Sequence, residues 1–147
     1  DVSAYELSLY LRSQAKRMAG ELAKLRFVVA IVLFGGVAQK NAWELSDLDM
    51  IIVVSGLVEK VREQVMSDIS KLESRYHFTI EPFILAEDDF LDNVHSHEGG
   101  IVYGLAEGCE VLVDKTGRLS RILSKRVEEI KCSHDYLKEV RIWLKVK

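Results

Sequence analysis

Hydrophobic and polar positions along the chain alternate between strand-like runs and helix-like stripes. Residues 27–34 form an unbroken apolar run of strand length, and residues 50–54 form a second one. Uninterrupted runs of this length are typical of strands that are covered on both faces. Apolar residues at helical spacing predict one helix over Tyr5 to Lys24 and another from Val58 onward. The pattern therefore predicts a sheet with helices packed on it.

Shorter elements complete the predicted core. A third strand is expected over about His77 to Leu85, and it should run parallel to the second because a helix connects them. The connector between the first two strands is too short for a parallel crossover, so these two should be antiparallel. A short helix from Glu87, a helix that ends near Gly108 and a strand over Cys109 to Val113 follow.

The C-terminal segment is basic and carries a helical stripe of apolar residues. We expect one long helix over about 118–146, packed on a core that spans about 27–113, within a single domain of residues 1–147. Ile142 and Trp143 lie off the stripe. They predict a surface for another subunit, either in a homodimer or with a helical partner; the alternative is that Trp143 folds back onto the core.

Composition narrows the class of protein. The chain is 48% hydrophobic and 29% charged, which is typical of a globular domain rather than a disordered one. A net charge of −3 argues against nucleic-acid binding by the whole surface. No apolar run has the length of a membrane span. Cys109 and Cys132 lack metal-site spacing and are expected to be reduced thiols in a cytoplasmic protein.

The candidate chemistry lies where the first two predicted strands meet. Asp47 and Asp49 are two residues apart at the mouth of the second strand, so their carboxylates project from one face. Paired carboxylates repel each other unless a cation lies between them, and hard oxygen ligands suit Mg²⁺. Gly35 and Gly36 end the first strand and leave backbone N–H groups open to an anion. The alternative is a tight turn at the glycines and a helix cap at Ser46.

A third carboxylate, Glu81, lies inside the third predicted strand. Beside the strand that carries the aspartates, it would face the same cations. The alternative is that Glu81 points to water from an edge strand, which the neighbouring Pro82 makes plausible because proline cannot donate to a strand ladder.

Together these residues resemble a known signature. Phe34-Gly35-Gly36, ten intervening residues and Asp47-Leu48-Asp49 are similar to the motif of the DNA polymerase beta-like nucleotidyltransferase superfamily, and above all to its minimal nucleotidyltransferases. The resemblance covers roughly Phe27 to Val113. Three positions depart from the family pattern: Gly36 replaces a serine, Gln39 replaces a basic residue, and Lys40 replaces a small one.

The resemblance implies a fold and a reaction. The fold would be an α/β (α+β) nucleotidyltransferase fold with a small mixed sheet flanked by helices. The reaction would move a nucleoside monophosphate, AMP from ATP, to an acceptor hydroxyl with release of pyrophosphate. Asp47, Asp49 and Glu81 would be the catalytic and metal-binding residues for two Mg²⁺ ions, with Mn²⁺ as a substitute. The residues expected to bind the nucleotide are Gly35, Gly36, Lys40 and Ser46.

The resemblance also implies a partner. Minimal members of the superfamily are often encoded beside a helical HEPN-type protein, and some act as antitoxins that adenylylate it. A protein acceptor is therefore the first expectation. The alternative is a catalytically degenerate subunit that binds and neutralises or scaffolds its helical partner, because Gly36 and Gln39 depart from the pattern.

Overall fold

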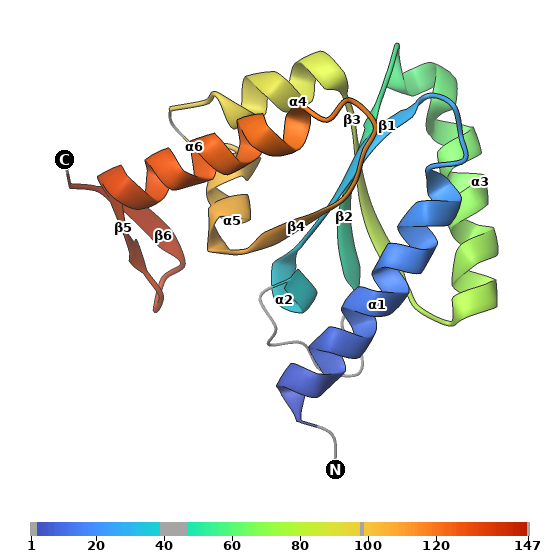
Figure 1. The fold of residues 1–147 in the computed structure, drawn as a ribbon, viewed down its shortest axis with the longest axis horizontal. Coiled ribbons are helices and arrows are strands. Elements are labelled where there is room, and N and C mark those ends of the chain that lie inside the picture. Colours follow the sequence, from blue (N-terminus) through green and yellow to red (C-terminus); the bar gives the residue numbers. More distant parts are fainter. Residues whose placement is uncertain (1–2, 39–46, 98, 147) are drawn as a thin grey trace.

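The computed structural model describes residues 3–38, 47–97 and 99–146, and it places helices on both faces of a four-stranded sheet (Figure 1). The chain runs through α1 (Ala4–Leu22), β1 (Val28–Phe34), α2 (Gly35–Ala38), β2 (Leu48–Val54), α3 (Val58–Tyr76), β3 (Ile80–Ala86), α4 (Glu87–Val94), α5 (Ile101–Glu107), β4 (Cys109–Asp114), α6 (Leu119–Ser133), β5 (His134–Leu137) and β6 (Ile142–Lys145).

The sheet is mixed, with strand order β3-β2-β1-β4. β1 is antiparallel to both β2 and β4, whereas β2 and β3 are parallel and joined by α3. These findings confirm the predicted small mixed sheet, the antiparallel pairing of the first two strands and the parallel pairing of the next two. The two longest apolar runs became the two central strands, because only a central strand buries both of its faces.

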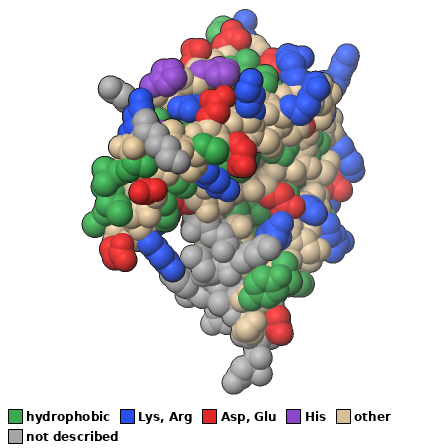
Figure 2. Space-filling model, turned by 60° about the vertical axis from the view of Figure 1, so that its left-hand side comes forward, with side chains coloured by type: hydrophobic (Ala, Val, Ile, Leu, Met, Phe, Trp, Pro, Cys, Tyr) green, Lys and Arg blue, Asp and Glu red, His purple; other side chains and the backbone are tan. Residues whose placement is uncertain are grey.

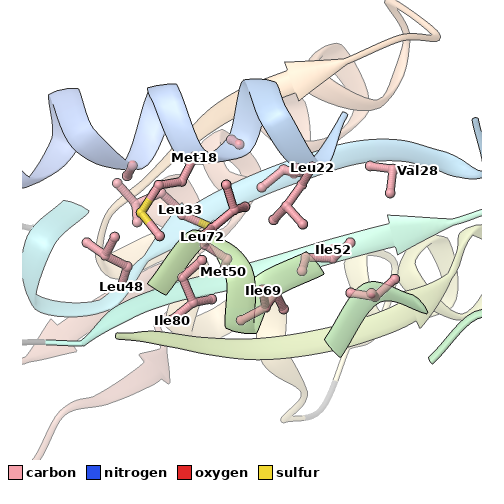
Figure 3. Packing of buried hydrophobic residues seen from close by; sticks show 14 of the residues in the cluster. Met18, Leu22, Val28, Leu33, Leu48, Met50, Ile52, Ile69, Leu72 and Ile80 are labelled. Carbon is pink, nitrogen blue, oxygen red and sulfur yellow. The ribbon is translucent and has the colours of Figure 1, made fainter. Parts of the chain in front are cut away.

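One face of the sheet is covered by α1 and α3. Met18 and Leu22 of α1 pack with Leu33 of β1 and Met50 of β2, and all four side chains are fully buried (Figure 3). Burying a side chain of this size favours folding by roughly 1.5–3 kcal/mol. This layer therefore fixes the position of β1 and β2, the two strands that carry the candidate site.

The other face is covered by α4, α5 and α6 (Figure 1). Phe90 of α4 and Leu105 of α5 are buried against Val32 of β1 and Ile51 of β2. Because α4 follows β3 directly, it folds back over the end where β3 finishes. The opposite end of this face, where β1 finishes and β2 and β3 begin, is the end at which the candidate residues lie.

β3 begins three residues later than the sequence predicted. His77 has a left-handed backbone (φ 62°) as the C-cap of α3, and its N–H donates to the carbonyl of Glu73. The carboxylate of Glu73 then accepts from the N–H of Ile80 at 2.9 Å. Residues 77–79 therefore form a turn between helix and strand. The strand predicted from the alternating pattern began three residues too early.

The predicted C-terminal helix is present as α6, but it ends at Ser133 rather than near residue 146. The chain instead continues into an antiparallel hairpin of β5 and β6. Tyr136 and Arg141 both donate to the carboxylate of Glu107, at 2.7 and 2.8 Å. The buried carboxylate of Glu107 on α5 holds the hairpin against the domain. A helix that continued past Ser133 would not bring Tyr136 and Arg141 to this carboxylate.

Trp143 folds back onto its own chain. Its indole Nε1 donates to the carbonyl of Tyr103 at 2.8 Å, and its ring lies 4.8 Å from that of Tyr136. The alternative, that Trp143 folds back onto the core, is therefore confirmed, while a role of this surface in binding another subunit stays a prediction. Ile142, by contrast, is 46% exposed.

On the face drawn in Figure 2, Lys and Arg side chains lie among Asp and Glu side chains rather than in separate regions. Cys109 and Cys132 are free thiols. Among the described residues, none of the helices combines the length and the apolar character needed to cross a bilayer.

Candidate active site

The two aspartates share a face because of the residue between them. Leu48 is the first residue of β2 and is fully buried in the layer beneath α1 and α3. Its N–H donates to the carbonyl of Thr79 at 2.8 Å, which fixes the start of β2 against the start of β3. Since side chains alternate along a strand, Asp47 and Asp49 both project to the opposite face. The negative charge of Asp47 acts on Asp49, as expected of carboxylates that lie near each other, and the role of the pair in binding a metal stays a prediction.

Glu81 lies beside Asp49 in the neighbouring strand. The parallel register pairs Asp49 of β2 with Glu81 of β3, so the two side chains emerge on the same face of adjacent strands. β3 is an edge strand and Glu81 is exposed. Both interpretations of this residue therefore contain something correct, because Glu81 is open to water and also neighbours the aspartates.

The three carboxylates influence one another electrostatically. Partial burial raises the pKa of Asp49, and the negative charges of Asp47 and Glu81 raise it further. A carboxylate that is held ionised in this environment at neutral pH is less stable than it would be in water. A cation at this position would relieve that repulsion.

The chemistry of these donors fits a divalent cation such as Mg²⁺, since they are carboxylate oxygens on one face of a rigid sheet. Their arrangement is open, however. Within the part of the chain that the structure describes, no three Asp, Glu, His or Cys side chains are close enough together to enclose a metal ion. The side chains of Asp49 and Glu81 would have to turn toward a shared ion on binding.

Gly35 lies against this cluster. It follows the last residue of β1, Phe34, which pairs with Asp49, and its φ is +75°. A Cβ at this position would collide with the carboxylate oxygen Oδ2 of Asp49 and would lie 3.1 Å from its Cγ. Only glycine satisfies both the left-handed backbone and this close approach. The glycine that sequence analysis assigned to phosphate binding therefore also makes room for the carboxylate.

The other predicted nucleotide-binding residues are placed only in part. Gly36 lies in α2 and is not among the residues with positive φ. A side chain at Gly36 would therefore meet no backbone strain of the kind present at Gly35. Lys40 and Ser46, together with Gln39, lie outside the described residues.

Two aromatic residues at this end of the sheet were not predicted as part of the site. The rings of Phe34 and Phe83 lie 5.4 Å apart, centroid to centroid, at an angle of 58°. Phe83 pairs with Ile51 in the parallel register and is 41% exposed. The available signal was the alternation along β3, because a residue two positions after Glu81 must share its face.

Comparison with known proteins identifies the family. Residues 16–106 match the sequence profile of the family described as "Polymerase beta, Nucleotidyltransferase". The chain belongs to this nucleotidyltransferase family. The matched stretch includes every described candidate residue of the site, so the resemblance read from the sequence is confirmed. No curated protein sequence gives a match to the chain.

Solved structures with the same fold include toxin–antitoxin complexes. One is a toxin–antitoxin complex with AMP-PNP, at 14% identity and a TM-score of 0.52, covering 80% of this chain and 87% of that chain. A second is a mutant of the MntA-HpeT toxin–antitoxin pair, at 13% identity and a TM-score of 0.51, with the same coverage. A weaker likeness, at 15% identity and a TM-score of 0.44, is to a tri-AMPylated Shewanella oneidensis HEPN toxin in complex with MNT antitoxin, covering 81% of this chain and 87% of that chain.

Proposed function

We propose that this protein is a Mg²⁺-dependent nucleotidyltransferase that moves AMP from ATP to a hydroxyl group on a partner protein in the cytoplasm. The observation that carries the proposal is the set of carboxylates at Asp47, Asp49 and Glu81, held on one sheet face beside Gly35. Membership of the nucleotidyltransferase family supports the reaction class.

The bond changes are those of a single displacement. The acceptor oxygen forms a bond to the α-phosphorus of ATP, the bond between the α-phosphorus and the bridging oxygen breaks, and pyrophosphate leaves. The hydroxyl proton passes to solvent. Mg²⁺, when bound, would neutralise triphosphate charge and lower the pKa of the acceptor hydroxyl. Asp47, Asp49 and Glu81 would hold two such ions, and Mn²⁺ would substitute.

The chain's own contribution to the phosphates is mainly backbone. The N–H groups of Gly35 and Gly36 would donate to phosphate oxygens, with no side chain in the way. Lys40 would supply a positive charge that Gln39 does not, and Ser46 would contribute a hydroxyl beside Asp47. Because Leu48 is buried on one face of β2, the side chains of Asp47 and Asp49 both project from the other face. The backbone would therefore not need to rearrange when these carboxylates bind the ions.

Gly36 sets the expected rate. A serine at this position would donate a hydrogen bond to a charged group, which is worth roughly 1.5–3 kcal/mol, or about ten- to a hundredfold in affinity or rate. The protein should therefore be a slow enzyme. The variant Gly36→Ser should be faster, because the backbone of α2 at this position accepts an L-residue.

A protein acceptor is the choice supported by the structural neighbours. Two solved structures with this fold are toxin–antitoxin complexes, one of them with AMP-PNP. We propose that the acceptor is a helical HEPN-type protein bound by this chain. A homodimer is the alternative assembly.

A non-catalytic role is the second candidate function. Gly36 lacks the hydroxyl of the family pattern, and the carboxylates of the described residues do not enclose a metal position. Such a subunit would bind and neutralise or scaffold its helical partner without transferring nucleotide.

A transfer assay separates the two functions. The chain is incubated with ATP labelled at the α-phosphate, Mg²⁺ or Mn²⁺, and a helical HEPN-type protein as the candidate acceptor. We expect the label to appear on the partner, more strongly with Gly36→Ser and not at all with Asp49→Asn. The matched control is Asp88→Asn, an equal change of charge at an exposed position in the first turn of α4, at the other end of β3. Partner binding without label from either the parent or a folded Gly36→Ser variant would establish the non-catalytic role.

A further inference from the structure

The aromatic pair of Phe34 and Phe83 lies on the same sheet face as the carboxylates. Phe34 is directly opposite Asp49 in the antiparallel ladder, and Asp49 is directly opposite Glu81 in the parallel one. Opposed residues share a face, as do residues two apart in a strand. Phe83 therefore projects beside Glu81, displaced along β3 by roughly 6.6 Å.

The helical layer stops short of this pair. Leu85, the next residue of β3 on this face, packs against the buried cluster beneath α4, α5 and α6. Phe83 does not belong to that cluster and is 41% exposed, although Ile51 beside it is fully buried. An aromatic ring thus remains open to solvent at the point where the covered part of the face ends and the carboxylates begin.

From this arrangement we propose that Phe83, whose ring packs against the tilted ring of Phe34, is the surface on which the base of the nucleotide stacks. The proposal rests on the proposed function and adds the recognition of the base. Phe34 directly precedes Gly35, whose N–H would hold phosphate. The ribose of the nucleotide would span the short distance between the base on Phe83 and the phosphates at Gly35. Phe34 is next to Gly35 in the sequence, and its ring lies 5.4 Å from that of Phe83.

Recognition by stacking has a consequence for substrate class. Stacking uses the π-face that every base has, and not the hydrogen-bonding edges that distinguish one base from another. ATP and GTP should therefore bind with similar affinity. CTP and UTP should bind a few-fold more weakly, because their single rings offer less surface to Phe83.

The test compares ATP with inorganic tripolyphosphate, which has the phosphates but no base. Affinities of both for the full chain are measured by calorimetry with Mg²⁺, for the parent, Phe83→Ala, Phe83→Leu and Phe83→Trp. Alanine replacement of a stacking aromatic weakens nucleic-acid binding by roughly 5- to 150-fold per base. Since Phe83 is partly covered, we expect a loss toward the lower end of that range, about 5- to 20-fold, for ATP with Phe83→Ala and Phe83→Leu. Tripolyphosphate should change less than about twofold, and Phe83→Trp should retain ATP binding.

A matched control is available on the other side of the sheet. Tyr10 is 55% exposed, against 41% for Phe83, and its ring lies 6.0 Å from that of Phe78 in another aromatic pair. Tyr10→Leu should leave both affinities unchanged.

Each result decides the proposal. An equal loss of ATP and tripolyphosphate affinity in Phe83→Ala, or no loss of either, would overturn base stacking while leaving the phosphate and metal site in place. A parent protein that binds neither ligand would overturn the proposed function, and base stacking with it. Selective loss of ATP affinity, rescued by Phe83→Trp, is the result we expect.

Discussion

The contact between Gly35 and Asp49 gives a prediction that can be worked out from the structure. Gly35→Ala places a methyl group in a left-handed conformation, which costs an L-residue roughly 1–2 kcal/mol. The methyl group also overlaps the carboxylate of Asp49, and overpacking of this kind costs about 1–3 kcal/mol. We therefore expect Gly35→Ala to lower the free energy of unfolding by about 2–5 kcal/mol.

A double-mutant cycle separates the two contributions. Asp49→Ala removes the carboxylate that the new methyl group would strike, but it does not change the backbone conformation of Gly35. In the Asp49→Ala background, Gly35→Ala should therefore cost only the backbone contribution. The expected coupling between the two substitutions is about 1–3 kcal/mol, measured by urea denaturation at neutral pH. Gly36→Ala is the control; without a positive φ it should change stability by about 1 kcal/mol or less.

A coupling near zero would refute this reasoning. It would mean that Asp49 turns away from the added methyl group at no cost, so that the approach of Gly35 does not hold the carboxylate in place. The Mg²⁺-dependent ATP affinity of Gly35→Ala provides a second readout, and we expect it to be lost even at temperatures where the variant remains folded.

Three further predictions concern single residues. Asp49→Asn should be as stable as the parent or more stable at pH 7, because the raised pKa of Asp49 means that ionisation of this carboxyl weakens folding. The denaturation curves of the variant and the parent should converge as the pH falls below 3.8, the ordinary pKa of an aspartate. Burial opposes ionisation of Asp114, but hydrogen bonds from Ser120 and Thr116 outweigh it and lower its pKa to about 2. After a discount for its partial exposure, Asp114→Asn should lose about 1–2 kcal/mol at neutral pH, and the difference should vanish as the pH falls from about 4 to 2. Trp143→Phe should lose about 0.5–1.5 kcal/mol through its hydrogen bond to Tyr103, without changing ATP affinity; an unchanged melting curve would contradict the contact.

Most of the core was predictable because hydrophobic burial dominates it. The apolar run of β1 requires cover on both faces, and the stripe from Val58 requires a helix on one of them, so the mixed sheet followed from the sequence pattern. The C-terminal hairpin was not predictable in the same way. Residues 134–146 contain no glycine, proline or asparagine, and their strand conformation depends on distant contacts with Glu107 and Tyr103.

The candidate site was likewise predictable from the sequence only in part. The shared face of Asp47 and Asp49 followed from alternation within one strand, which needs no knowledge of the rest of the fold. The approach of Gly35 to Asp49 depends on the register of β1 against β2, and the pairing of Phe34 with Phe83 depends on three strands at once. Neither register can be read from spacing along the chain.

The central claim is that the carboxylates of Asp47, Asp49 and Glu81 bind a nucleotide together with Mg²⁺. Calorimetric titration of ATP into the chain, with Mg²⁺ and with a chelator in its place, tests that claim most directly. The account predicts binding that requires Mg²⁺ in the parent and in Asp88→Asn, and none in Asp49→Asn. Equal ATP affinity with and without Mg²⁺, or in Asp49→Asn and the parent, would contradict it.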